Sequence, residues 1–225
     1  MKQFLMSAAV IALFSLPVVA DDAATAVPAD GAITPIATEA PSGRYTLDKY
    51  HSTLIFRVSH LGYANYTAQF KTFDAVLDLD VKAPQQSKLE ATVDPMSLDI
   101  PPPPEGFLDE LRGPNWLSAA MFPRMVYRST SIEMTSPNTA RITGEFDFHG
   151  VKKPVVLDAT FNGGYAGFPL DPHARIGFSA KGSLKRSEFG VAAGIPEPGT
   201  NMGVSDAVEI ILETEFSGPD WKKPE

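Results

Sequence analysis

The sequence predicts an all-β fold built from one antiparallel sheet. Apolar and polar residues alternate over most of the chain, as in Leu54, Phe56 and Val58, and a period of two is typical of a strand with one dry face. Glycine, proline, asparagine and aspartate separate these stretches, as they do in turns. Stretches with helical periodicity are scarce. These three observations favour strands connected by turns over any helical or mixed architecture.

Composition limits the function. The chain has 225 residues, 44% of them hydrophobic, which is typical of a globular protein. It contains no cysteine, which excludes a disulfide framework, a thiolate nucleophile and a cysteine-ligated metal. The formal net charge of −8 disfavours nucleic acid as a partner, because phosphate groups require a surplus of lysine and arginine.

The first residues have the pattern of a secretory signal peptide. Lys2 precedes an apolar run from Phe4 to Ala20, which ends in a small residue. A basic start, a short apolar run and a small residue at its end indicate cleavage during export. A retained membrane helix is disfavoured, because the run is short and contains Pro17. We predict a signal peptide over residues 1–20 and a periplasmic location.

The remaining chain divides into a spacer, a domain and a tail. Residues 21–43 are rich in alanine, threonine and proline and have no regular period, so we expect a flexible linker. Residues 44–216 carry the alternating stretches and form one β domain. Residues 217–225 are expected to form a polar tail.

The expected strands follow one another along this domain. About eight or nine stretches have the alternating pattern. They are residues 45–48, 53–59, 73–81, 89–93, 125–132, 142–148, 155–161, 176–180 and 208–215. Asn162-Gly163-Gly164 is a turn signal, so we expect the chain to reverse there.

One or two short helices are expected, over residues 107–112 and 115–120, separated by Gly113 and Pro114. A sheet of this many amphipathic strands either pairs face to face as a sandwich or closes into a barrel. The alternation of residues is compatible with both. It is also compatible with either a packed or a hollow interior.

Ten fragments resemble, in order, the YceI-like family of secreted lipid-binding proteins. They span essentially all of residues 44–216. The fragments are Tyr45-x-Leu47-Asp48-x-x-His51-Ser52, Leu54-x-Phe56-x-Val58-x-His60-x-Gly62, Phe70-x-x-Phe73, Asp94-x-x-Ser97-Leu98-Asp99, Leu111-Arg112-Gly113-Pro114-Asn115-Trp116-Leu117, Phe122-Pro123, Arg128-Ser129-Thr130, His149-Gly150-Val151-x-Lys153-Pro154-Val155-x-Leu157, Arg186-Ser187-Glu188-Phe189-Gly190 and Ser205-Asp206-x-Val208-x-Ile210.

The resemblance implies an antiparallel, extended lipocalin-like β-barrel of about eight strands with a long apolar tunnel. Family members take up long-chain amphiphiles there, polyisoprenoids in particular, without a metal, a cofactor or catalysis. The resemblance therefore implies a periplasmic carrier or buffer for an isoprenoid or other long-chain lipid. Transient membrane contact and a homodimer are both compatible with it. Glu110 and residues 194–203 depart from the family pattern, so the head-group preference does not carry over.

Ten side chains are candidate ligand contacts if the sheet closes around such a tunnel. Most are inward-facing residues of the expected strands, and the others lie where a tunnel would open. They are Phe56, Val58, His60, Phe73, Leu77, Trp116, Phe146, Phe148, Phe178 and Arg186.

Three of these candidates have structural alternatives. His60 continues the apolar face of its strand and is either a hydrogen-bonded histidine at the barrel end or a donor to a head group. Trp116 either fills a gap beneath a short helix or covers the tunnel mouth. Arg186 suits an anionic head group, but an ion pair with Glu188 or Asp206 at the surface is favoured.

Other functions are less well supported. A hydrolase or isomerase would use His51, with Asp48 beside it, or His60, but Asp48 more simply organises a turn. A metal site is disfavoured because the four histidines are far apart in sequence, with His149 on a solvent-facing strand face and His173 in a loop. An outer-membrane barrel would need its apolar face outward. A packed sandwich would serve as an interaction module.

Overall fold

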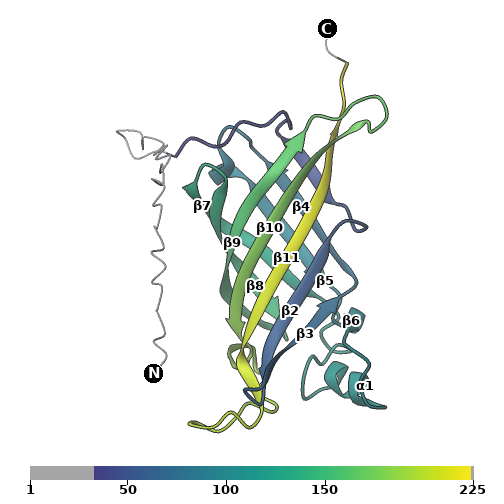
Figure 1. The fold of residues 1–225 in the computed structure, drawn as a ribbon, viewed down its shortest axis with the longest axis vertical. Coiled ribbons are helices and arrows are strands. Elements are labelled where there is room, and N and C mark those ends of the chain that lie inside the picture. The colour runs from purple at the N-terminus through teal and green to yellow at the C-terminus, as the bar shows by residue number, and fades with distance from the viewer. Residues whose placement is uncertain (1–32, 224–225) are drawn as a thin grey trace, which may run out of the picture. The chain divides into compact units, whose positions relative to one another are not determined.

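The structure is a computed structural model and describes residues 33–223. Within that range, eleven strands form one antiparallel sheet that closes into a barrel (Figure 1). The strands are β1 (Gly43–Leu47), β2 (Thr53–His60), β3 (Ala64–Phe70), β4 (Phe73–Leu79), β5 (Lys88–Val93), β6 (Leu98–Asp99), β7 (Met125–Ser136), β8 (Thr139–Phe148), β9 (Val151–Tyr165), β10 (His173–Lys185) and β11 (Val204–Asp220). One α-helix, α1 (Phe107–Arg112), and three 3-10 turns complete the described residues.

The last strand closes the barrel. One edge of β11 pairs with β10, and its other edge pairs first with β2 and then with β1. The closed ring runs β1-β4-β5-β7-β8-β9-β10-β11, and β2, β3 and β6 extend the wall. We call the end with α1 the lower end and the end with the β9–β10 loop the upper end (Figure 1). The barrel is thus confirmed, and the sandwich alternative is wrong.

The apolar residues of the strands face the interior. Buried side chains such as Tyr127, Phe148 and Leu157 pack together inside the barrel. The outer surface carries cross-strand ion pairs, for example Arg128 with Glu90, whose side chains are both about half exposed. This orientation is the reverse of what the outer-membrane alternative requires. Among the described residues, no helix is long and apolar enough to cross a membrane.

A glycine allows the largest interior side chain of β7 to lie flat on its neighbour. A Cβ at Gly144 would come within 2.3 Å of the Tyr127 ring and 2.7 Å of the Arg128 carbonyl oxygen. The Tyr127 hydroxyl donates to the carbonyl oxygen of Ile142, at 3.0 Å, and burial raises the pKa of this phenol. The hydroxyl is therefore satisfied by backbone and does not need a ligand.

Three strand predictions need correction. Strand β6, which was not predicted, has only two residues, too few to show alternation. Strand β3 was missed, because Gly62 and Asn65 indicate a turn, yet Tyr66 and Phe70 point inward in the period-two pattern. The turn expected at residues 162–164 is wrong. Strand β9 continues to Tyr165, and its register against β10 shifts opposite Phe161 and Gly163. The glycine signal therefore marks a β-bulge rather than a reversal.

The linker and tail boundaries also differ from the prediction. Residues 33–42 pack on the barrel: Ala40 is buried, and the Tyr45 hydroxyl donates to the Pro41 carbonyl at 2.7 Å. At the other end, β11 includes residues 217–220, because Ser217 and Asp220 pair with neighbouring strands. Both segments lack alternation but make backbone hydrogen bonds. The predicted signal peptide and residues 21–32 of the linker lie outside the described residues.

The predicted helix over residues 107–112 is present as α1. Residues 115–120 form turns instead of a second helix. Ser118 adopts a left-handed conformation, with φ of 45°, which a regular helix cannot contain. The long connection between β6 and β7 therefore holds only one helical element.

Candidate functional site

An elongated cavity of about 490 Å³ runs through the barrel. Residues of β11 line it from Val204 to Phe216, which is roughly 40 Å along a strand that rises about 3.3 Å per residue. The volume lies within the range of roughly 300–1,000 Å³ that is typical of small-molecule sites. The interior is therefore hollow.

The middle of the cavity wall is apolar. Leu77 lines it together with Phe56 and Phe178. Aromatic rings pack in pairs along the wall, with centroids 5.4 Å apart for both Phe56–Phe70 and Phe161–Phe178. A surface of this kind favours hydrocarbon, because polar groups would find few hydrogen-bond partners there.

The upper end of the cavity is bounded by residues 33–42, which we call the strap (Figure 1, purple). The Ile36 amide donates to the Pro137 carbonyl at 2.7 Å, and the Thr38 hydroxyl donates to the Gly164 carbonyl at 3.4 Å. Ile36 and Thr38 also line the cavity. The strap therefore forms part of the upper wall.

A buried guanidinium lies at the lower end. Arg186 is only 5% exposed, and it donates to four backbone carbonyls. The distances are 3.0 Å to Ser205, 3.1 Å to Val191, 2.6 Å to Ala193 and 2.8 Å to Val204. Burial lowers the pKa of this guanidinium. Four carbonyl oxygens thus contact the charge directly, and among the described residues no carboxylate lies within ion-pair distance of it.

Two further polar side chains gather near Arg186. The Trp116 ring lies over the guanidinium, with its centroid 5.1 Å from Cζ, a cation–π contact that connects the α1 segment to the barrel. His60 lies at the end of β2, opposite Val204, and also lines the cavity. The lower end therefore offers an arginine, an indole and an imidazole next to the apolar wall.

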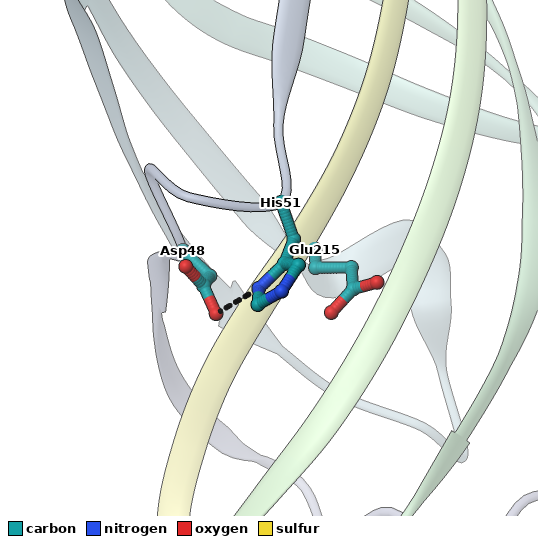
Figure 2. A group of neighbouring side chains, drawn as sticks. All are labelled: Asp48, His51 and Glu215. Carbon is teal, nitrogen blue, oxygen red and sulfur yellow. Dashed lines mark hydrogen bonds and ion pairs between the residues drawn. The ribbon is translucent and has the colours of Figure 1, made fainter.

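A separate cluster lies outside the cavity, where the β1–β2 turn meets β11. Figure 2 shows its members, Asp48, His51 and Glu215. His51 Nδ1 donates to Asp48 Oδ2 at 2.9 Å, and Arg175 Nη1 donates to the same oxygen at 2.7 Å. The hydrogen bond from His51, followed by those of Arg175 and the Tyr50 amide, lowers the pKa of Asp48 to about 2. The same bond raises the pKa of His51.

This cluster is better suited to holding the turn than to chemistry. One potential ligand atom from each member lies within 4.8 Å of the others. However, Asp48 already accepts three hydrogen bonds, and one of its donors, the positively charged Arg175 at 2.7 Å, would repel a metal ion. A protein metal site usually needs three or four ligands. We therefore interpret Asp48 as a clamp between the turn and β10.

Comparison with known proteins identifies the family. The YceI-like domain profile matches residues 45–216. A UPF0312 protein from Pseudomonas savastanoi is 30% identical over 190 residues, which covers 83% of this chain and 91% of the relative. Protein YceI from Salmonella heidelberg is 32% identical over 181 residues, 78% of this chain and 87% of the relative. The chain belongs to the YceI-like family.

Solved structures show the same YceI-like fold. BcnA from Burkholderia cenocepacia superposes with a TM-score of 0.64 at 22% identity, over 75% of this chain and 98% of that one. A polyisoprenoid binding domain from Saccharophagus degradans superposes with a TM-score of 0.53 at 12% identity, over 78% and 98% of the two chains. At these identities the similarity supports the architecture alone.

The structure of this YceI-like chain places all ten predicted contact residues on the cavity wall. They are Phe56, Val58, His60, Phe73, Leu77, Trp116, Phe146, Phe148, Phe178 and Arg186. Their contact with a ligand stays a prediction. The Trp116 ring packs on Arg186 and lines the cavity, and its role beneath the helix or over the tunnel mouth stays a prediction.

Three side chains are not where the sequence predicts them. His173, expected in a loop, is the first residue of β10 and pairs with Asp220 of β11. Arg186 forms no surface ion pair with Glu188 or Asp206, since Asp206 accepts hydrogen bonds from Ser187 instead. His149 does not lie on a solvent-facing strand face. It occupies the β8–β9 turn with φ of 55° and packs against Phe122, with ring centroids 4.7 Å apart. His149 lies in a turn between two strands, so the alternation of the strands does not predict the direction of its side chain.

Several wall residues were missed. The strap residues Pro35, Ile36 and Thr38 line the upper end, and Tyr66 of β3 lines the lower half. The alternation of Tyr66 with Ala68 and Phe70 was the available signal for β3. The strap has no such signal, because the position of a segment without regular secondary structure depends on its tertiary contacts.

Proposed function

We propose that this protein binds a long-chain apolar amphiphile, a polyisoprenoid or related lipid, in the barrel cavity. The observation that carries this proposal is the continuous apolar cavity between two ends that bear polar side chains. The apolar middle of the cavity suits a hydrocarbon tail, and the polar side chains at an end of the cavity suit a head group. The Saccharophagus relative, named a polyisoprenoid binding domain, supports the same class of ligand.

The energetics of such a cavity suit exchange. Burying a methylene from water is favourable by about 0.8 kcal/mol, but a lipid tail in a bilayer is already out of water. Transfer from bilayer to cavity therefore changes the hydrophobic free energy little, so both capture and release are accessible. We accordingly propose a carrier or buffer in the periplasm, reached through the predicted signal peptide.

A binding role fits the polar groups better than an enzymatic one. His51 and His173, the histidines with acidic partners among the described residues, both lie outside the cavity wall. A general base must lie within hydrogen-bond reach of the proton it removes. A tail inside the barrel would be separated from His51 by the wall itself.

The test is native mass spectrometry of protein purified from its own periplasm, with extraction of bound lipid. Ala180 faces the cavity, so Ala180→Phe fills part of it, whereas Ala207→Phe places the same ring on an exposed position. We expect the wild type and Ala207→Phe to carry a lipid and Ala180→Phe to carry much less. Lipid-free wild type that also fails to take up added polyisoprenol would refute the proposal.

A further inference from the structure

The upper end carries an apolar side chain on a tight, well-anchored turn. In the β9–β10 loop, Phe168 and Asp171 exchange backbone hydrogen bonds of 2.9 and 3.0 Å. Pro169 and Leu170 therefore form a two-residue apex, and Leu170 is 90% exposed. Phe168 beside it is 46% exposed. Two large apolar side chains thus project from one hairpin tip.

Hydrogen bonds fix this tip to the barrel. The Asp171 carboxylate accepts from the Tyr165 hydroxyl and from Arg175 Nε, the latter at 2.8 Å. Arg175 in turn binds Asp48. The loop is therefore held in place from both flanking strands, so Leu170 cannot fold back onto the core without breaking this network.

The end of β11 adds an indole and two cations to the tip. The Trp221 amide donates to the Pro172 carbonyl at 2.7 Å, and a Cβ at Gly167 would lie 3.0 Å from the Trp221 Cβ. Lys222 and Lys223 follow and are exposed. Neither lysine forms an ion pair with another residue in the described range.

We propose that this tip, Phe168, Leu170, Trp221, Lys222 and Lys223, docks the barrel on a lipid bilayer that contains anionic phospholipid. Apolar side chains enter the boundary of the acyl region, tryptophan favours the interface, and lysine ammonium groups lie near lipid phosphates. The strap and the upper end of the cavity lie at the same end of the barrel (Figure 1). Docking here would bring that end to the membrane, which extends the proposed function without depending on it.

The lower end also exposes apolar side chains, namely Tyr63, Met121 and Met202, at 84%, 73% and 71%. Its exposed charges have both signs: Glu105, Asp109, Glu110, Glu188 and Glu197 on one side, and Arg124, Lys152, Lys153 and Lys185 on the other. Charge alone therefore does not distinguish the two ends. We place the bilayer at the upper end because the hydrogen-bonded turn between Phe168 and Asp171 holds Leu170 outward beside Trp221.

The experiment is sedimentation with vesicles, using protein purified from the periplasm whose intact mass confirms removal of the signal peptide. Vesicles are phosphatidylcholine alone, or equal parts of phosphatidylcholine and phosphatidylglycerol. We expect the wild type to bind the mixed vesicles and Leu170→Asp to lower partitioning at least about tenfold. Lys222→Gln with Lys223→Gln should lower binding to mixed vesicles only, by roughly fivefold per lysine.

Met202→Asp is the matched control, because it makes the same kind of substitution at a comparably exposed residue on the lower end. It should bind as the wild type does. Equal binding of Leu170→Asp and wild type, or equal loss in Met202→Asp, overturns the proposal. A third outcome also overturns the proposal: the wild type fails to bind vesicles, and Leu170→Asp has a different oligomeric mass from the wild type. That result would mean that the tip is a protein–protein interface. Cavity lipid is measured separately on the same samples, so failure of docking and failure of lipid binding are distinguishable.

Discussion

The Asp48 carboxylate stabilises its own turn and connects that turn to β10. It accepts hydrogen bonds from His51 and Tyr50 in its own turn and from Arg175 on β10. Its side chain is only 11% exposed. The carboxylate therefore has a structural task that its place in a short polar turn would not reveal.

Asp48→Asn should destabilise the protein by about 1–3 kcal/mol near neutral pH, because hydrogen bonds to a charged acceptor are lost. The pKa of Asp48 falls from 3.8 to about 2 on folding. A depressed pKa stabilises the folded state above the unfolded value, and that stability is lost as the pH falls from about 4 towards 2. Urea unfolding at about pH 5 and about pH 2.5 measures the difference.

The control for this prediction is Asp158→Asn, which removes one partner of the exposed Arg141–Asp158 pair. Exposed pairs contribute about 0–1 kcal/mol, so this variant should stay close to the wild type at both pH values. If Asp48→Asn unfolds at the same urea concentration as the wild type, the carboxylate is not the clamp described above.

Arg186→Lys should destabilise the protein by at least about 2 kcal/mol, because an ammonium group has three donors and cannot reach four carbonyls in the planar arrangement that a guanidinium serves. Arg57→Lys, at an exposed ion pair with Glu209, is the matched control and should be nearly neutral. Thermal unfolding of both variants distinguishes them. A nearly neutral Arg186→Lys would mean that the carbonyls are satisfied in another way.

The sequence predicted such residues unevenly. Eight of the ten predicted contacts are strand residues, and they lie on the cavity wall because period-two alternation defines the direction of a strand residue. Trp116 and Arg186 also line the wall but lie outside the strands, where alternation predicts no direction. The partners of Arg186 could not be predicted, because they are backbone carbonyls, which every residue has, and only the folded loop brings them together. The same holds for His149, whose direction depends on a left-handed turn.

At the scale of elements, pairing between strands requires glycine where a large side chain lies over the backbone of the neighbouring strand. Gly144→Ala should destabilise the barrel by about 1–3 kcal/mol, because the new methyl group would overlap the Tyr127 ring and a backbone carbonyl that cannot move independently. Gly177→Ala is the control, since its Cβ would have no contact closer than 3.8 Å. Denaturant unfolding of the two variants should separate them; equal midpoints would contradict the packing described for β7 and β8.

Element prediction succeeded where one face of a strand is dry and failed elsewhere. Strand β3 starts among turn-forming residues, so only its second half shows alternation. The bulge in β9 has the composition of a turn, because both features need backbone conformations that glycine adopts more easily than other residues. The sequence predicts a linker for the strap and a tail for the end of β11, because their packing comes from tertiary contacts that leave no periodicity.

For the whole molecule, a hollow interior predicts that stability depends on the ligand. A ligand that binds only the folded state adds about 2.7 kcal/mol when its free concentration is a hundred times its Kd. Delipidated protein should therefore unfold at a lower temperature than protein returned to polyisoprenol, as measured by calorimetry. Ala180→Phe should lose most of this difference, and Ala207→Phe should keep it. An identical unfolding temperature with and without lipid would contradict binding in the cavity.

The fold as a whole was predictable only through the family resemblance. Alternation alone left barrel and sandwich open, because both bury one face of every strand. The deciding contact is between β1 and β11, which are separated by nearly the whole domain. Pairing between such distant segments has no local sequence pattern.

The pairing of β11 also governs the order of assembly. Strands β1, β2 and β10 all take their partner from the final seventeen-residue strand. A growing polypeptide therefore cannot complete the ring until β11 has left the ribosome. Until then, three strand edges and the apolar inner face of the sheet remain exposed to solvent. Exposed edges favour aggregation, and pairing between distant segments slows folding. A chaperone that shields the nascent polypeptide until β11 has emerged would meet that need.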